Sequence, residues 1–464
     1  MEALSLQTIA EFSGGKIERG DPAKLIRSIS TDSRTIAAEE FFVPLRGENF
    51  DGHKFLAQVI ERGAAGALVD QSWQGDSRPD FAVVRVADTL VGYQQIAANY
   101  RKSLPIKVVA ITGSNGKTST KDFVAAVLAR RFQVSKTEGN LNNHVGLPRT
   151  ILNANRSDEI GVWEIGMNHP GEIGSLAPVA APDLAIITNV GSAHIEFMGS
   201  REAIAEEKGS LAAAVEESGT VILNGDDDFS DAIAKRVRGK VLFAGINRGW
   251  IRAEDVRLTG GGCEFTILEG AHRCRAELPV PGAHMVQNAL LAVAAGRVFG
   301  LSLEDCAAGL ANAPLTKARL QIREINGVRF IDDSYNANPD SMKAALRTLA
   351  DLETDGRRFA VLGQMGELGA ESERGHREVG EAAAACGIDQ LITIGEIAAQ
   401  ISGAAKAAGL ANSKNVSDQS EAAELLVQSV AAGDLVLIKG SRTARTERVL
   451  EEFVSRQSRS GVSV

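Results

Sequence analysis

The 464-residue sequence predicts an α/β protein of three domains, at residues 1–104, 105–313 and 314–464. Short apolar runs alternate with amphipathic stretches, a pattern typical of mostly parallel sheets with helices packed on their faces. The boundaries lie at Ser103-Leu104-Pro105 and Asn312-Ala313-Pro314, because proline interrupts helices and restricts the residue before it. We therefore expect a small N-terminal α/β domain, a central domain with a mostly parallel sheet and a Rossmann-like, doubly wound C-terminal domain.

The composition is that of an ordinary globular protein, with 44% hydrophobic and 23% charged residues. The net charge of −9 argues against nucleic acid as the main partner, because binding to its phosphates requires a basic surface. The four cysteines lack the spacing of a zinc site or a disulfide framework. No signal peptide is indicated, and no apolar run approaches the ~20 residues that span a bilayer. We expect a cytoplasmic monomer without a membrane span.

In the N-terminal domain, strands are expected at 41–45 and 67–69, with a helix over 55–63. Two polar loops, at 30–34 and 47–53, follow apolar segments. Polar residues in loops are usually solvated, and the hydroxyl, amide and basic groups of these loops equally suit a pocket for a nucleotide diphosphate. The spacing of the residues leaves both interpretations open.

The central domain begins with an apolar run at 108–111, followed by a glycine-bounded turn and an amphipathic stretch from Lys117. Such a strand, loop and helix direct backbone N–H groups and the positive helix N-terminus towards a phosphate. Lys117 would reach the terminal phosphates of ATP, and the Thr118 hydroxyl would bind Mg²⁺. The general GxxxxGK[ST] pattern is incomplete, because Ile111 stands where its first glycine is expected. A strand-turn-helix without a ligand is the alternative.

Three strand ends of the central domain, at Gly113, Glu164 and Asn189, are expected at one crevice, because ligands collect at the carboxyl ends of parallel strands. Glu164 is suited to Mg²⁺, with a surface acid as the alternative. A lone histidine such as His194 is more often structural than a ligand. The charged run 206–208 is by default a solvated helix face.

The C-terminal domain also has polar runs directly after predicted strands. Residues 332–339 follow a strand at 328–331 and suggest ligand binding, although Asn and Asp also favour turns. Residues 363–369 follow an apolar run but lack the GxGxxG spacing of NAD-binding proteins. Residues 439–442 end another strand in basic and hydroxyl groups that suit an anion.

Five motifs together resemble the Mur ligase family of ATP-dependent amide-forming enzymes. They are ThrGlySerAsnGlyLysThr (112–118), TrpGluIleGlyMet (163–167), AsnValGlySerAlaHis (189–194), ProGlyAlaHisMetValGlnAsnAlaLeu (281–290) and LysGlySerArg (439–442). The resemblance covers essentially the whole chain. It implies a UDP-substrate domain, a P-loop ATPase-like domain and a ligase domain, in that order, with ATP and Mg²⁺ as cofactors.

Residues 137–143, 332–339 and 362–369 are most similar to the family member that joins D-alanyl-D-alanine to a UDP-N-acetylmuramoyl-tripeptide. These two compounds are the implied small-molecule partners. Another Mur ligase that extends a UDP-muramoyl peptide is the alternative, but the Asp-Asn-Pro-Arg motif of the member that adds a diaminoacid is absent. Folylpolyglutamate synthases share the ATP loop but are not expected to carry the N-terminal loops.

The resemblance also implies roles for single residues. Lys117 neutralises phosphate charge, Thr118 and Glu164 hold Mg²⁺, and His194 binds a second metal. Lys208 matches a lysine that is carbamylated in several family members, and an unmodified ammonium beside a dication would be repelled. Lys117, Lys208 and His194 are thus the implied catalytic residues.

Two further sets of contacts follow from the same resemblance. Nucleotide contacts are implied for Gly113, Ser114, Asn115, Gly116, Lys117, Thr118, Ser119, His284, Asn288, Arg319, Asp333 and Asn336. Substrate contacts are implied for Ser33, Arg34, Gly47, Asn49, Asp51, His53, Asn142, Asn143, Asn338, Lys439, Ser441 and Arg442.

The implied reaction has two steps. The tripeptide carboxylate attacks the γ-phosphoryl group of ATP, and the amine of the dipeptide then displaces phosphate from the acyl phosphate. Two other classes stay open, namely a P-loop kinase or NTPase and a non-catalytic nucleotide sensor. The identity of the third residue of the tripeptide, diaminopimelate or lysine, is also open.

Overall fold

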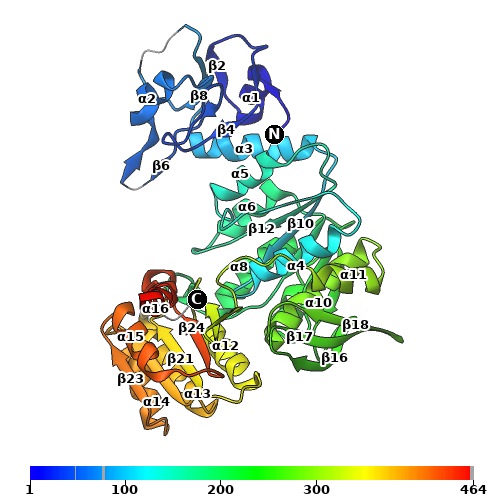
Figure 1. Cartoon of the computed structure of the whole chain (residues 1–464). Helices are drawn as coiled ribbons and strands as arrows, with labels where there is room; N and C mark the ends of the chain where they lie inside the picture. The colour runs from blue at the N-terminus through cyan, green and yellow to red at the C-terminus, as the bar shows by residue number, and fades with distance from the viewer. Residues whose placement is uncertain (48, 76–78, 460–464) are drawn as a thin grey trace.

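A computed structural model describes residues 1–47, 49–75 and 79–459 and contains three large sheets that follow one another along the chain (Figure 1). The predicted α/β class is confirmed. Residues 48 and 76–78 of the predicted N-terminal domain, and 460–464 of the predicted C-terminal domain, lie outside the described residues. The domain boundaries at 104 and 313 stay predictions.

The first sheet has five strands in the order β2-β9-β8-β5-β4, with only the β2–β9 pair antiparallel. The strands are β2 (Lys16–Arg19), β4 (Ile29–Ser30), β5 (Phe41–Phe42), β8 (Gly66–Val69) and β9 (Ala82–Arg85). The expected strand at 41–45 is shorter, because Pro44 has no N–H to extend the ladder. The expected helix over 55–63 is a 3₁₀ turn, η1 (Gly52–Phe55), that continues into α2 (Leu56–Glu61).

Helix α3 (Thr89–Ser103) joins the first sheet to the second. Its Tyr100 hydroxyl donates to the carbonyl of Ala154 (2.7 Å), and Arg101 pairs with Asp183 (3.2 Å). One hydrophobic core extends from α1 (Leu6–Ser13) through α3 to Trp163 of the second sheet. The N-terminal part is therefore packed on the central part as well as linked to it.

The second sheet has nine strands in the order β11-β12-β10-β13-β14-β15-β16-β17-β18. The first seven run parallel, and the seventh, β16, forms an antiparallel meander with the last two. The strands are β10 (Lys107–Thr112), β11 (Val134–Lys136), β12 (Ile160–Glu164), β13 (Leu184–Ile187), β14 (Thr220–Asn224), β15 (Lys240–Ala244), β16 (Ile251–Leu258), β17 (Cys263–Glu269) and β18 (His272–Leu278). Since β10 lies between β12 and β13, the three expected strand ends meet at one edge.

Helices cover both faces of this sheet. They are α4 (Lys117–Leu128), α5 (Gly146–Asn153), α6 (Glu172–Ala180), α7 (Ile195–Met198), α8 (Arg201–Ala213), α9 (Ser230–Ala234), α10 (Ala283–Val298) and α11 (Leu303–Ala311). Helix α10 is buried along almost its whole length against α4 and the meander, which explains why its sequence is apolar on every face.

The third sheet has six strands in the order β19-β20-β24-β21-β22-β23, with only the β19–β20 pair antiparallel. The strands are β19 (Gln321–Ile325), β20 (Val328–Asp333), β21 (Arg358–Gly363), β22 (Gln390–Ile394), β23 (Ser413–Val416) and β24 (Leu435–Lys439). The helices are α12 (Pro339–Asp351), α13 (Ser372–Ala385), α14 (Ala399–Ala407), α15 (Gln419–Ser429) and α16 (Glu447–Arg459).

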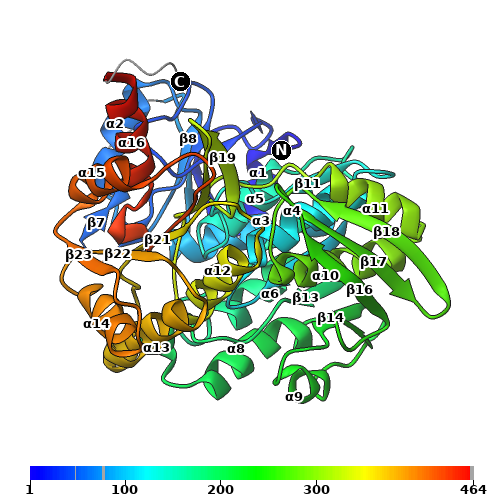
Figure 2. The ribbon, with the colours of Figure 1, turned by 60° about the horizontal axis from the view of Figure 1, so that its bottom comes forward.

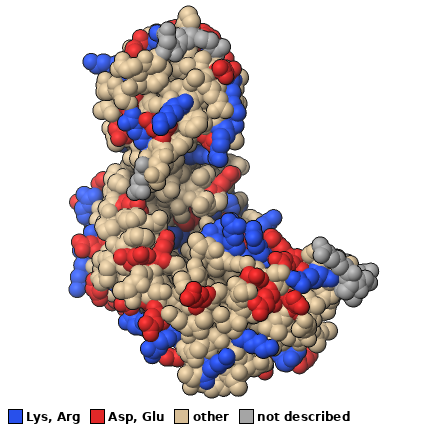
Figure 3. All heavy atoms as spheres, turned by 90° about the vertical axis from the view of Figure 1, so that its left-hand side faces the viewer, with Lys and Arg blue, Asp and Glu red and all other residues tan. Residues whose placement is uncertain are grey.

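In Figures 1 and 2, α12 lies on the side of the C-terminal part that faces the central part. Figure 3 shows that the surface is hollowed between the N-terminal and C-terminal parts, with acidic and basic side chains mixed over this face. In the described part of the chain, no helix is long and apolar enough to cross a bilayer.

Candidate active site

The loop between β10 and α4 is held in place by residues that follow β13. The backbone N–H of Ser114 donates to the Asn189 carbonyl (3.0 Å), and that of Asn115 to Asn189 Oδ1 (2.9 Å). The N–H of Gly191 donates to Ser114 Oγ (2.8 Å). The predicted strand, loop and helix are thus present, and a second loop supports the first from the neighbouring strand.

Two glycines let this loop adopt its shape. Gly113 and Gly116 have φ angles of 156° and 78°, and a Cβ would lie 1.8 Å from Thr188 Oγ1 at the first and 2.5 Å from Asn288 Oδ1 at the second. Gly116 precedes α4, whose N-terminus has no side-chain cap. The N-terminal N–H groups of α4 are therefore available to an anion.

Two lysines lie close to this loop, Lys117 half-buried and Lys208 buried. Lys117 Nζ donates to the carbonyl of Gly113 (2.8 Å), and burial lowers the pKa of Lys117, with Glu164 opposing and Arg319 adding to the shift. Lys208, on α8, is 1% exposed. Burial, and then the positive charge of Lys117, lower the pKa of Lys208 well below its ordinary value, while Glu207 opposes. The equilibrium at Lys208 is therefore shifted towards the neutral amine, relative to an exposed lysine.

The neighbour of Lys208 has a structural task. The carboxylate of Glu207 accepts N–H groups from Gly171 (2.8 Å), Ile173 (2.7 Å) and Gly174 (3.3 Å) at the N-terminus of α6. The interpretation of 206–208 as a solvated helix face holds for the exposed Glu206 and is wrong for Glu207 and Lys208. The reason is that α8 packs against α6 and β13.

Glu164 is only 2% exposed, so the alternative of a surface acid is wrong. Its Oε2 accepts the Thr118 hydroxyl (2.9 Å) and its Oε1 accepts Asn142 Nδ2 (2.7 Å). Arg319 Nη2 donates to Thr118 Oγ1 (3.0 Å). A carboxylate, a hydroxyl and an amide thus converge beside the phosphate-binding loop, and these oxygen groups are of the kind that Mg²⁺ prefers.

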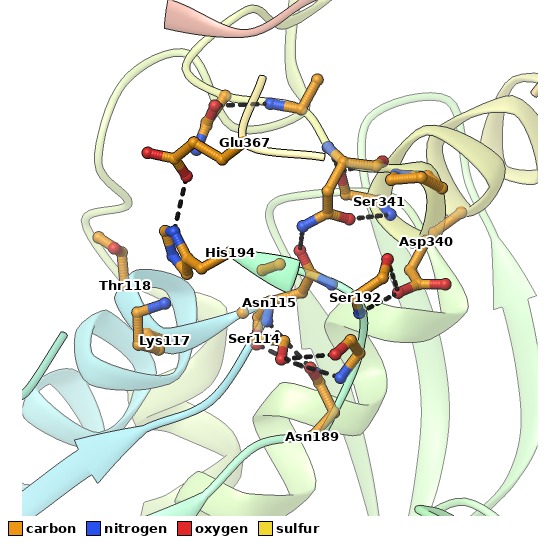
Figure 4. A pocket seen from close by; sticks show the side chains of 18 of the residues that line it. Ser114, Asn115, Lys117, Thr118, Asn189, Ser192, His194, Asp340, Ser341 and Glu367 are labelled. Carbon is orange, nitrogen blue, oxygen red and sulfur yellow. Dashed lines mark hydrogen bonds and ion pairs between the residues drawn. The ribbon is translucent and has the colours of Figure 1, made fainter. Parts of the chain in front are cut away.

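His194 faces the C-terminal part across the cleft. Its Nδ1 lies 2.6 Å from Glu367 Oε2, and this contact is the leading cause that lowers the pKa of Glu367. Both residues have left-handed backbone (φ 63° and 58°), an uncommon conformation outside glycine that turns each side chain into the gap. Figure 4 shows His194 and Glu367 pointing towards one another.

The N-terminal end of α12, with its cap Asn338, makes further contacts across the gap. Asn338 Nδ2 donates to Asn115 Oδ1 (2.7 Å). Asp340 Oδ2 accepts the N–H (2.9 Å) and the hydroxyl (3.0 Å) of Ser192. The contacts between Asp340 and Ser192 also appear in Figure 4. The phosphate-binding loop and the loop that supports it are therefore both joined to the C-terminal part.

Further polar groups from α10 and the third sheet line the same cleft. Burial lowers the pKa of His284 to about 4, with Asp333 opposing and Lys439 adding, so its imidazole is neutral at neutral pH. Lys439 Nζ donates to Asp333 Oδ2 (2.6 Å) and to the Asn336 carbonyl (2.9 Å). The ammonium group of Lys439, predicted to bind an anion, thus already donates hydrogen bonds to residues of its own domain.

The cleft has a volume of about 1150 Å³ and collects most of the predicted site residues. Its lining includes Ser114, Asn115, Gly116, Lys117, Thr118, Ser119, Asn142, Asn143, Glu164, His194, His284, Asn288, Arg319, Asp333, Asn336, Asn338, Lys439, Ser441 and Arg442. It also includes Ser192, Asp340 and Glu367, which our sequence analysis did not assign. Each of these three residues follows a predicted strand, and this position was the feature of the sequence that could have identified them.

The predicted residues of the N-terminal domain are not in this lining, as far as the described residues show. His53 is 8% exposed, and its ring nitrogens lie 2.8 Å from Asp51 Oδ1 and 3.3 Å from the N–H of Asp70. Arg34 pairs with Asp32 (2.8 Å) and stays exposed. Ser33, Gly47 and Asn49 lie in the same two loops.

Comparisons with known proteins agree with this arrangement. Residues 111–296 match the family model of the Mur ligase middle domain, and residues 318–442 match that of the Mur ligase, glutamate ligase domain. The chain is 37% identical to the UDP-N-acetylmuramoyl-tripeptide–D-alanyl-D-alanine ligase of Bacillus subtilis, over 97% of this chain and 98% of that protein. It is 35% identical to the same-named ligase of Escherichia coli, over 97% and 98%.

Solved structures are similar over the same length. A crystal structure of MurF from Acinetobacter baumannii superposes with a TM-score of 0.91 at 32% identity, over 98% of this chain and 99% of that one. MurF ligase from Thermotoga maritima, solved in complex with ADP, has a TM-score of 0.85 at 29% identity, over 94% and 99%. With both domain models and full-length relatives matched, the chain belongs to the Mur ligase family.

Proposed function

We propose that this chain is an ATP-dependent ligase that joins D-alanyl-D-alanine to a UDP-N-acetylmuramoyl-tripeptide, forming the UDP-muramoyl-pentapeptide precursor of peptidoglycan. The observation that carries the proposal is the single cleft in which the loop at 113–118, buried Glu164 and the polar ends of β20 and β24 meet. The names of the relatives supply the substrates.

Nucleotide binding is assigned to the loop and its surroundings. The open N–H groups of α4 and the charge of Lys117 suit the phosphates. Arg319 lies beside Thr118 and adds a second cation. His284, Asn288 and Asn336 are assigned to the adenosine side, where a neutral His284 imidazole can hydrogen-bond without a charge. Asp333 orients Lys439.

The residues present fit Mg²⁺. Thr118 and Glu164 would hold it, since Mg²⁺ sites usually combine one or two carboxylates with phosphate oxygens and water. His194 is assigned to a second metal. Bound there, Mg²⁺ would supply positive charge to the phosphoryl oxygens. Asn142 already donates to Glu164 and so orients the carboxylate.

Lys208 is assigned to carbamylation. A neutral amine attacks CO₂ to form a C–N bond and releases one proton, and the lowered pKa of Lys208 favours that neutral form. The carbamate carries a negative charge, so it would relieve the repulsion between Lys208 and Lys117. Mass spectrometry of the intact protein in bicarbonate checks this, with Lys208→Ala as the control that cannot take the 44 Da adduct at this position.

The rest of the assignment concerns the UDP-linked substrate. Its uridine-diphosphate end is assigned to Ser33, Arg34, Gly47, Asn49, Asp51 and His53 in the N-terminal domain, and its peptide to Asn142, Asn143, Asn338, Lys439, Ser441 and Arg442. The hollow between the N-terminal and C-terminal parts supports a long substrate that spans them (Figure 3). The same proposal includes domain boundaries at residues 104 and 313. It also includes a monomeric, cytoplasmic protein.

The reaction is proposed to use the cleft in two steps. The tripeptide carboxylate attacks the γ-phosphoryl group, ADP leaves, and the dipeptide amine then attacks the acyl phosphate and releases phosphate. The two reactants are both anionic and would otherwise repel each other. Lys117 and Arg319 offset this repulsion with positive charge. Contacts from α12 and Glu367 bring the two walls of the cleft together, which limits water around the acyl phosphate.

The test is a product assay with purified protein. ADP and phosphate release should require both the UDP-muramoyl tripeptide and D-alanyl-D-alanine, and mass spectrometry should find the joined pentapeptide. Repeated turnover without the dipeptide, with ADP and a stable phosphorylated substrate as the end products, would instead identify a kinase. Lys117→Ala should reduce ligation by at least about 100-fold, and full activity in that variant would refute the central assignment.

A further inference from the structure

The segment between the second and third sheets, residues 314–320, runs along helix α4. The N–H and the hydroxyl of Thr316 both donate to Asp122 Oδ2, at 2.9 and 2.7 Å. Three residues later, Arg319 Nη2 donates to Thr118 Oγ1 (3.0 Å). Thr118 and Asp122 are four residues apart and so share one face of α4. The linker therefore contacts the helix at two successive turns.

Asp122 is a strong anchor because it is a buried carboxylate. Its side chain is 1% exposed, and its Oδ1 lies 3.3 Å from Lys121 Nζ and 3.2 Å from Lys136 Nζ. Burial raises the pKa of Asp122, but these cations and the Thr316 donors outweigh it and leave the pKa below its ordinary value. Hydrogen bonds to an ionised, buried acceptor are stronger than neutral ones.

The same network reaches the predicted metal ligand. Lys121 Nζ donates to the Thr137 carbonyl (2.9 Å), and the Thr137 hydroxyl accepts the backbone N–H of Glu164 (2.9 Å). Asp122 itself is not in the lining of the cleft, within the described residues. Any effect it has on the nucleotide must therefore act through other groups.

Arg319 lies in a backbone that needs fixed points on both sides. Ala318 and Leu320 have left-handed φ angles of 59° and 52°, which residues with side chains adopt only where their surroundings hold them. After Arg319, the Leu320 side chain is buried at 1% exposure. Before it, Thr316 is held by Asp122. The guanidinium itself stacks over Tyr335, 4.3 Å from the ring centre.

We propose that Asp122 is a positioning residue of the nucleotide site, which fixes Thr316 and so holds Arg319 beside Thr118. The Asp122–Thr316 contact then also fixes the linker to α4. The nucleotide part of this inference rests on the proposed function. The fixed linker rests on geometry alone.

The first test compares two substitutions at one partly exposed position, which avoids removing the buried charge of Asp122. Thr316→Val keeps the shape and loses the hydroxyl, whereas Thr316→Ser keeps the hydroxyl. We expect Thr316→Val to bind MgADP about tenfold more weakly by calorimetry, because one charge-assisted hydrogen bond is lost. Thr316→Ser should stay within about twofold of the parent.

A double-mutant cycle separates positioning from general destabilisation. If Thr316 acts through Arg319, Thr316→Val should change MgADP affinity little when Arg319→Ala is already present. Equal losses in both backgrounds would overturn the positioning role. So would unchanged affinity of Thr316→Val in a parent protein that binds MgADP.

A second readout needs no nucleotide. Amide hydrogen exchange of peptides covering 314–321 should be faster in Thr316→Val than in the parent and Thr316→Ser, with peptides from β10 unchanged. Unchanged exchange in the linker would overturn the fixed point. Failure of the parent to bind MgADP would refute the proposed function instead, and the exchange result would still decide whether Asp122 fixes the linker.

Discussion

At the scale of residues, the cleft and its immediate surroundings hold charged groups that the fold buries. Glu164 and Lys208 are 2% and 1% exposed, and a buried charge is costly unless it is paired or neutralised. The Glu164 carboxylate accepts hydrogen bonds from Thr118 and Asn142, whereas Lys208 has its pKa lowered. Because their surroundings differ in this way, we assign Glu164 as an ionised metal ligand and Lys208 as a reactive amine.

A glycine of the loop gives the first residue-scale prediction. Gly116→Ala forces a Cβ to within 2.5 Å of Asn288 Oδ1, and we expect MgADP binding to weaken by at least about tenfold. Gly171 is a matched control, because it also precedes a helix with left-handed φ (86° against 78°) but has open space around it. Gly171→Ala should cost about 1 kcal/mol of stability and leave affinity unchanged. Equal affinities in the two variants would contradict the prediction.

The histidine of α10 gives a prediction for pH dependence. The pKa of His284 is about 4 in the folded chain, below its ordinary 6.5, so between these values the unfolded chain binds a proton that the folded chain does not. Its contribution to stability is full above pH 6.5 and is lost as the pH falls towards 4. From pH 7.5 to 5, the free energy of unfolding should fall by about 1–2 kcal/mol more in the parent than in His284→Asn. Urea unfolding at both pH values measures this, and equal losses would refute it.

At the scale of elements, α12 has two tasks at its N-terminus. Asn338 accepts the N–H of Ser341 (2.9 Å) as a helix cap, with proline at the next position. The same side chain donates to Asn115 of the phosphate-binding loop. Asn338 therefore caps α12 and also joins the two walls of the cleft.

Substitutions at this cap separate the two tasks. Asn338→Ala removes both and should cost about 1 kcal/mol of stability. Asn338→Asp keeps the cap but cannot donate to Asn115, so it should weaken nucleotide binding without that loss. Ser302→Ala removes the cap of α11, away from the cleft, and should reproduce only the loss of stability. Chemical denaturation and MgADP titration of the three variants check the pattern, which fails if Ser302→Ala also weakens binding.

At the scale of the whole molecule, the central and C-terminal parts are held together by polar contacts around the cleft and by shared apolar packing. Asp340 accepts two hydrogen bonds from Ser192, and a Cβ at Gly191 would displace this carboxylate, because it would lie 2.5 Å from Asp340 Oδ2. Hydrophobic side chains of both parts also share one core. Polar groups at a cleft can replace their contacts with each other by contacts with a substrate. The side chains of a wholly apolar interface could not do so.

Loss of one of these contacts should loosen the arrangement. Asp340→Ala should enlarge the radius of gyration in small-angle X-ray scattering, because Ser192 loses its acceptor. Asp351, exposed at the other end of α12, is the control. Asp351→Ala should scatter like the parent, and identical scattering of all three proteins would show that Asp340 does not hold the domains.

The sequence by itself determined the α/β class, the loop at 113–118 and the strand end that carries Glu164, because these depend on local apolar runs and on glycine and lysine at fixed spacing. It also led to the family, through motifs that recur in order. Only the tertiary structure decided that Lys208 is buried, that His194 meets Glu367 and that Asp122 holds Thr316. Burial and contacts between residues far apart in the chain arise from packing of helices and loops, and local patterns do not encode which partner a side chain meets.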